Sequence, residues 1–312
     1  MVGVCSVRLS NRKQKTDMAK HEFGGEWTAE KLERLQKYLC AYTVIFKKNP
    51  RAQYFTTIYV DAFAGAGHRS DRPKPGATDD VLGHVGDPEV ESFKKGSARI
   101  ALEVEPPFDR FIFIERAAAR VKELEALRKQ FPTKADDVQI QQGDANSFLL
   151  GWCRETNWRK YRAVVFLDPY GMQADWETIK ALAETKAIDM WLLFPLGMAV
   201  NRLLPRAGPP DKPWHDALTR IFGTEDWLAA FYPKVQKETL WGPETTQRKQ
   251  APLDDIARFF EDRLRTVFAG VAPNPLRLTN STGMPIYLFC FAAGNPKGAT
   301  TAVRIARHIL ET

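Results

Sequence analysis

The sequence predicts an α/β fold built on a doubly wound, mostly parallel sheet, and two observations support this. Short apolar runs alternate with segments of helical periodicity along most of the chain. The runs are continuously apolar, which is typical of parallel strands that are buried on both faces. Strands that alternate with helices give the connectivity of such a sheet. The 312 residues are enough for one large domain or two modest ones.

The regular structure begins with a helix. A helix of about 20 residues is predicted after Trp27 and Thr28, because Leu32, Leu35 and Leu39 recur at helical spacing. The β-branched and aromatic composition of five runs predicts strands at residues 54–61, 108–115, 138–142, 161–167 and 188–194. Helices are predicted between them near residues 96–102, 121–131, 147–153 and 176–186. A late strand at 285–292 and a helix at 300–310 close the chain.

Three stretches depart from this alternation. Residues 1–22 form a basic tail, and the first twenty residues hold five Lys or Arg and one Asp in a chain of net charge +7. Such a tail suits a nucleic-acid partner, or it is a solvated extension. Residues 68–96 are rich in Gly, Pro and Asp and are predicted to be a long loop. We expect one domain over residues 23–312, with a helical insertion at about 198–250.

The cysteine and histidine patterns argue against a metal site. The four cysteines form no CxxC pair, and the five histidines show no HExxH or comparable spacing. No apolar run approaches the ~18 residues of a membrane span, and the N-terminus lacks the apolar region of a secretory signal. A soluble, cytoplasmic protein without a metal or a membrane partner is therefore expected.

Four predicted strands end in residues that could bind a ligand. In a doubly wound sheet, ligands bind beyond the carboxyl ends of the strands. The first strand runs into Asp61-Ala-Phe-Ala-Gly-Ala-Gly67, the second ends at Glu115, and the third ends at Gly143-Asp144-Ala145. The fourth continues into Asp168-Pro-Tyr-Gly171. The four ends together point to one ligand site along a single edge of the sheet.

Each of the first three ends has a functional and a structural interpretation. The Asp61–Gly67 loop suits a close approach of backbone to ligand, or it is a tight turn. Glu115 could accept the hydroxyls of a ribose, or it is an ordinary exposed carboxylate before a helix. Asp144 could accept an adenine amino group, or it caps the following helix.

The fourth end carries the most specific chemistry. The Asp168 carboxylate and the Pro169 carbonyl offer two acceptors for an NH₂ group, and Tyr170 offers a face for stacking with a planar base. This arrangement suits an exocyclic amine that attacks a methyl sulfonium. The structural alternative is a β-turn with Asp and Pro in favoured positions.

The order of these motifs resembles the class I S-adenosylmethionine-dependent methyltransferases. A closer resemblance is to the three-Cys-motif partner protein family, carried by FGGEWTAEKL at residues 23–32, YVDAFAGAG at 59–67, residues 108–115, and the block from FLDPYGM to VNRLL at 166–204. The resemblance covers about residues 20–235. It implies a Rossmann-like methyltransferase fold, S-adenosylmethionine as cofactor, and a partner protein that bears a three-cysteine motif.

On this resemblance the site residues receive roles. The expected catalytic residues are Asp168, Pro169 and Tyr170. Asp61 is expected to face the methionine end of the cofactor, Glu115 its ribose and Asp144 its adenine. The expected cofactor-binding set is Asp61, Phe63, Ala64, Gly65, Gly67, Glu115, Arg116, Asp144 and Ala145, and the expected nucleic-acid contacts are Arg69, Arg72 and Arg202.

The substrate stays open at this point. Amino-methyltransferases of adenine and cytosine usually carry two prolines after the Asp or Asn, whereas this sequence has Pro169 alone and then Tyr170-Gly171. The single proline looks more like the motif of tRNA guanine-N2 methyltransferases, so both DNA and RNA are candidates. A methyltransferase acting on a small molecule or protein, and a non-catalytic partner protein, are the alternative functions. The sequence does not predict an oligomeric state.

Overall fold

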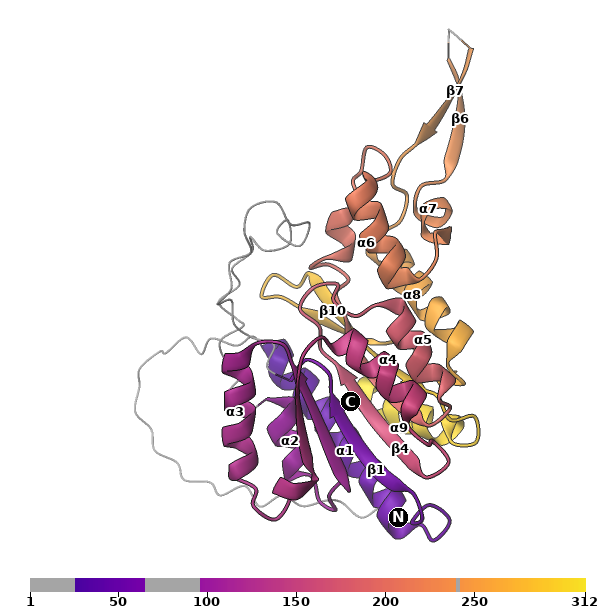
Figure 1. The fold of residues 1–312 in the computed structure, drawn as a ribbon. Helices are drawn as coiled ribbons and strands as arrows, with labels where there is room; N and C mark the ends of the chain where they lie inside the picture. The colour runs from indigo at the N-terminus through magenta and orange to yellow at the C-terminus, as the bar shows by residue number, and fades with distance from the viewer. Residues whose placement is uncertain (1–25, 65–95, 240–241) are drawn as a thin grey trace, which may run out of the picture.

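The computed structural model describes residues 26–64, 96–239 and 242–312 (Figure 1). The predicted basic tail at 1–22 and nearly all of the predicted loop at 68–96 lie outside the described residues. No described helix is long and apolar enough to cross a membrane.

The core of the fold is an eight-stranded sheet with the order β3-β2-β1-β4-β5-β10-β8, in which β9 also pairs with β10. Strands β1 to β5 are parallel to one another, and β8, β9 and β10 are antiparallel to their neighbours. The predicted doubly wound, mostly parallel α/β fold is therefore confirmed. The strands are β1 (Thr56–Asp61), β2 (Arg110–Glu115), β3 (Val138–Gln142), β4 (Tyr161–Leu167), β5 (Ile188–Phe194), β8 (Gly270–Val271), β9 (Leu276–Thr279) and β10 (Pro285–Ala293).

Helices cover both faces of this sheet because side chains of each strand point alternately to the two faces. Ile58 and Val60 of β1 join one apolar core, and Tyr59 between them joins the other. The first core packs under α4 (Ala145–Glu155), α5 (Trp176–Glu184), α6 (Lys212–Phe222), α7 (Asp226–Phe231) and α8 (Leu253–Val267). The second packs under α1 (Glu26–Lys48), α2 (Ser97–Glu103), α3 (Ala118–Lys129) and α9 (Ala299–Glu311).

Residues 198–250 combine short helices with a β-hairpin. The segment contains the 3₁₀ helix η4 (Val200–Leu203), then α6 and α7, and then the antiparallel strands β6 (Lys234–Thr239) and β7 (Gly242–Gln247). Figure 1 shows this hairpin projecting away from the helices at one end of the molecule. The hairpin is mostly polar, so it lacks the apolar run by which the sheet strands are recognised.

Gly223, in this segment, packs against the start of α5. It ends α6 in the left-handed conformation, with φ of 66°. A Cβ atom there would lie 1.9 Å from Cδ1 of Trp176, the buried first residue of α5. The end of α6 therefore requires glycine for two independent reasons.

Replacing Gly223 with alanine should lower the free energy of unfolding by about 2–5 kcal/mol, measured by urea denaturation. The left-handed conformation costs about 1–2 kcal/mol, and overpacking against Trp176 costs about 1–3 kcal/mol more. Gly283 is the matched control, because its φ is 74° and a Cβ there would meet open space. Equal losses in G223A and G283A would contradict the role given to the Trp176 contact.

Candidate functional site

The carboxyl ends of β1, β2 and β4 lie side by side in the sheet. Asp61, the last residue of β1, is in register with Phe113 of β2 and Phe166 of β4. Glu115 ends β2, and Asp168 follows directly after β4. The structure therefore brings Asp61, Glu115 and Asp168 to one edge of the sheet, where ligands of doubly wound folds bind.

Asp61 is buried, with none of its surface exposed. Ser97 of α2 and the Tyr59 hydroxyl (3.4 Å) both donate hydrogen bonds to its Oδ2 atom. Its Oδ1 atom is buried and accepts no hydrogen bond from the described residues. Burial raises the pKa of Asp61 to about 7, against the hydrogen bond from Ser97 and the nearby backbone amide of Phe63, and the negative charge of Asp168 adds to the rise. A buried acceptor without a partner is costly, so this oxygen is suited to a donor from a ligand.

Lys31 forms a buried ion pair with Asp168. Its Nζ atom lies 2.6 Å from Oδ2 of Asp168, and the two side chains are 1% and 12% exposed. The ammonium also lies over the rings of Trp27 (5.3 Å) and Phe166 (5.9 Å). One oxygen of the predicted catalytic carboxylate is therefore bound by a lysine from the N-terminal helix.

The strand-end motifs do not point to Lys31, because it lies on the N-terminal helix. The signal that could have found it is its position, because Leu35 and Tyr38 follow four and seven residues later on the same buried face of α1. A lysine on an apolar helix face almost always has a partner. Its partner is 137 residues away in the sequence, so periodicity alone could not supply it.

Asn146 holds the loop that follows Asp168. It lies in the first turn of α4, and its Oδ1 atom accepts hydrogen bonds from the Asp175 amide (3.1 Å) and the Thr178 hydroxyl (2.8 Å). Its Nδ2 atom donates to the Gln173 carbonyl (2.7 Å). Tyr170 lies in this loop with 42% of its surface exposed. Asn146 is therefore a second supporting residue that the sequence analysis did not find.

The other two predicted carboxylates make local hydrogen bonds. Glu115 is half-buried, and its Oε1 atom accepts from the Ala117 amide (2.7 Å). Asp144 is exposed and caps α4, because its Oδ1 atom accepts from both the amide and the hydroxyl of Ser147 (2.9 Å each). The helix cap that the sequence offered as one interpretation of Asp144 is thus present in the structure.

The remaining predicted residues lie in different environments. Phe63 and Ala64 are partly buried after β1, Arg116 is exposed after β2, and Ala145 is buried at the start of α4. Pro169 is buried, and Arg202 is exposed on η4. Gly65, Gly67, Arg69 and Arg72 lie outside the described residues.

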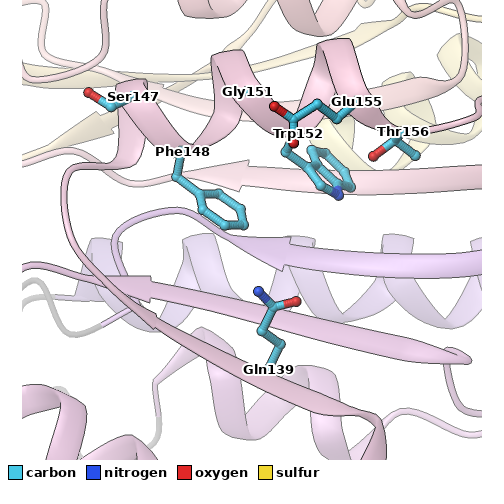
Figure 2. Close-up of a pocket in the computed structure, with 7 residues that line it drawn as sticks. All are labelled: Gln139, Ser147, Phe148, Gly151, Trp152, Glu155 and Thr156. Atoms are coloured by element: carbon cyan, nitrogen blue, oxygen red, sulfur yellow. The ribbon is translucent and has the colours of Figure 1, made fainter.

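A pocket of about 420 Å³ lies between β3 and α4. Figure 2 shows Phe148 and Trp152 of α4 and Gln139 of β3 facing this space. None of the predicted site residues lines the pocket. Its lining includes Ser147, whose amide donates to the Asp144 side chain that caps α4. The part of the chain that the structure describes holds no group of three or more His, Cys, Asp or Glu side chains that could bind a metal ion.

Comparisons with known proteins give structural likenesses only. No family model matches the chain, and no curated protein matches it. A Legionella pneumophila protein is 13% identical over 94% of this chain and 93% of its own, with a TM-score of 0.44. An O-methyltransferase from Bacillus cereus, in complex with SAH, is 13% identical over 70% and 90%, with a TM-score of 0.30. Spermidine synthase from Thermotoga maritima is 10% identical over 82% and 69%, with a TM-score of 0.28.

The resemblance to the three-Cys-motif partner family stays a prediction.

Removing the lysine of the buried ion pair should be strongly destabilising. We expect Lys31→Met to lower the free energy of unfolding by about 3–5 kcal/mol, because it leaves a carboxylate of low exposure without its partner. The double variant K31M/D168N should recover part of this loss, and a double-mutant cycle from urea denaturation measures the coupling.

Lys37 on the same helix is the control. It pairs with Glu33 at 2.7 Å on the exposed side of α1, so K37M should change the free energy of unfolding by less than about 0.5 kcal/mol. If K31M and K37M cost the same, the Lys31–Asp168 pair does not stabilise the fold.

Proposed function

We propose that this protein is an S-adenosylmethionine-dependent methyltransferase that acts on an exocyclic amino group of a nucleic-acid base. The observation that carries the proposal is the pair of carboxylates at the ends of β1 and β4. Asp61 offers a buried oxygen that has no donor among the described residues, and Asp168 begins the Asp-Pro-Tyr turn beside it. Each carboxylate is positioned by a separate helix, through Ser97 of α2 and Lys31 of α1.

The residues on the β1 and β2 side suit the cofactor. The free Oδ1 atom of Asp61 could accept from the ammonium of the methionine moiety. Glu115 could bind the ribose with Oε2, since Oε1 is already bound to the Ala117 amide. Asp144 and Ala145 stand at the end of the next strand, where the adenine would lie. When bound, S-adenosylmethionine supplies a methyl group that its sulfonium has already activated.

The residues after β4 suit a planar amine substrate. Lys31 binds Oδ2 of Asp168, so Oδ1 is the oxygen that remains for a substrate NH₂ group. The exposed ring of Tyr170 could stack on a base, an interaction worth ~1–3 kcal/mol. Catalysis would then depend mainly on the orientation of the substrate amine toward the methyl group. The ion pair with Lys31 and the hydrogen bonds of Asn146 hold the residues that would orient it.

Binding of S-adenosylhomocysteine should stabilise the protein and release protons near pH 7. A ligand at ~100 times its dissociation constant adds ~2.7 kcal/mol, which raises the melting temperature by several degrees at ~2–4 °C per kcal/mol. Because the pKa of Asp61 is raised to about 7, this group is partly protonated there. An ammonium placed beside it would lower that pKa, so binding expels a proton.

Thermal unfolding and calorimetry in two buffers of different ionisation enthalpy measure the two effects. D61N keeps the shape of the side chain but has no proton to lose, so it should bind more weakly and release none from this position. Absence of stabilisation by both S-adenosylhomocysteine and S-adenosylmethionine would contradict the proposed cofactor.

Asp168→Asn should reduce methyl transfer by at least ~100-fold while the stabilisation by S-adenosylhomocysteine remains. Asparagine preserves the volume and leaves an oxygen for Lys31, whereas alanine would leave a buried lysine without its partner. Transfer of labelled methyl groups to total RNA and to DNA is the measurement. Y170F, which keeps the stacking ring, is the control and should stay active. If D168N transfers methyl groups as well as the wild type does, the role assigned to Asp168 is rejected. If the wild type binds the cofactor but methylates neither RNA nor DNA nor any other substrate, the non-catalytic alternative is favoured.

A further inference from the structure

Four basic residues lie in the two segments that follow β5 and β7. Arg202 lies on η4, Arg206 follows it in the connection to α6, and Arg248 and Lys249 come directly after β7. The Lys249 amide donates to the Arg206 carbonyl (3.3 Å), which joins the two segments. Residues 198–206 and 246–252 contain these four cations and no acidic residue. The four residues are called the basic cluster below.

The cations of this cluster lack carboxylate partners in the part of the chain that the structure describes. The Nζ atom of Lys249 donates to Oδ1 of Asn201, a neutral amide. Partial burial lowers the pKa of Lys249, and the positive charge of Arg206 lowers it further. Keeping like charges close together costs folding free energy. A bound anion would remove that cost.

Other cations nearby are neutralised by acids. Lys212 of α6 pairs with Asp216 (3.0 Å), and Arg220 of the same helix pairs with Asp175 (3.1 Å). Acidic partners are therefore available in this part of the fold. The basic cluster differs from its surroundings in having none.

The cluster lies on the edge of the sheet that carries the candidate site. Leu167 of β4 is in register with Leu192 of β5, so the two strands end at the same edge. The chain then turns through Gly197, whose amide donates to the Ile286 carbonyl (3.0 Å) at the start of β10, and enters η4. Asp168 and Arg202 thus follow the ends of neighbouring strands. In Figure 1 the hairpin β6–β7 extends outward from this region.

We infer that the basic cluster binds the phosphate backbone of a nucleic-acid strand whose base enters the candidate site, an inference that rests on the proposed function. Three arginines and a lysine without carboxylate partners among the described residues suit phosphodiesters, since phosphate contacts position a nucleic acid without reading its sequence. The exposed Tyr170 ring on the same edge favours a polymer that carries planar bases over an acidic protein.

The test measures nucleic-acid binding separately from methylation. Labelled oligo(dT) and oligo(U) are the probes, because thymine and uracil have no exocyclic amino group to be methylated. Fluorescence anisotropy between about 50 and about 200 mM salt gives the affinity and its salt dependence. The variant R202Q/R206Q/R248Q removes three exposed charges and leaves Lys249 bonded to Asn201.

The matched control is R51Q/R159Q/K160Q. These three exposed cations precede β1 and β4 at the opposite edge of the sheet, so the change in net charge is the same. We expect the cluster variant to bind at least ~10-fold more weakly at low salt. Its plot of log affinity against log salt should lose about 2–3 units of slope, at ~0.7–1 unit per lost phosphate contact. The control should bind as the wild type does.

Three results would overturn the inference: wild-type affinity and slope in the cluster variant, an equal loss in the control, or competition by poly-glutamate as effective as that by unlabelled oligonucleotide. The preferred polymer, oligo(dT) or oligo(U), distinguishes DNA from RNA. Stabilisation by S-adenosylhomocysteine is measured on the same variants and should be retained. If the wild type binds oligonucleotide but not S-adenosylhomocysteine, the proposed function fails while the phosphate contact stands.

Discussion

The buried ion pair between Lys31 and Asp168 joins the N-terminal helix to the carboxyl end of the central strand β4. Two charges removed from water are stable only when each satisfies the other, so α1 must lie where Lys31 reaches the end of β4. Two further polar contacts fix the same helix across the sheet. The Tyr38 hydroxyl donates to Asp189 at the start of β5 (2.7 Å), and Lys47 binds Asp109 just before β2. The helix therefore crosses the sheet from its carboxyl edge to its amino edge in one defined position.

Asp61, bonded to Ser97 of α2, and Asp189, bonded to Tyr38 of α1, differ in whether a buried oxygen is left without a partner among the described residues. Burial raises the pKa of Asp189 to about 7, but Tyr38 gives this carboxylate a direct donor at the amino edge of the sheet. Asp61 at the carboxyl edge keeps an oxygen without a partner among the described residues. Buried polar atoms are nearly always bonded in folded proteins. Thr28, Arg34, Arg162 and Trp191 also have such an atom, but Asp61 is the carboxylate among them and lies where a doubly wound sheet binds its ligand. Asp61 therefore fits a binding role and Asp189 a structural one.

More of the fold than of the candidate site could be predicted from the sequence. Strands such as β4 and β5 are continuous apolar runs, and their predicted bounds, residues 161–167 and 188–194, match the structure. The hairpin β6–β7 and the short strands β8 and β9 were not predicted, because polar or very short segments carry no such pattern. The carboxylates could be proposed from their places at strand ends. The sequence does not show that Lys31 and Ser97 are their partners, since these contacts depend on how distant helices pack.

The proposed function divides the candidate site between the strand ends that suit the cofactor and the residues after β4, where Tyr170 is exposed. A small molecule is usually held in a concave pocket that covers most of its surface, whereas Tyr170 is exposed and the pocket beside α4 contains none of the site residues. A polymer can obtain its affinity elsewhere, because enzymes that modify a base hold the backbone outside the site and admit only the flipped nucleotide. The basic cluster lies on the same edge, in the segment that follows β5. On the proposed function, an exposed Tyr170 with the basic cluster on the same edge of the sheet suits a base within a nucleic-acid strand better than a free amine.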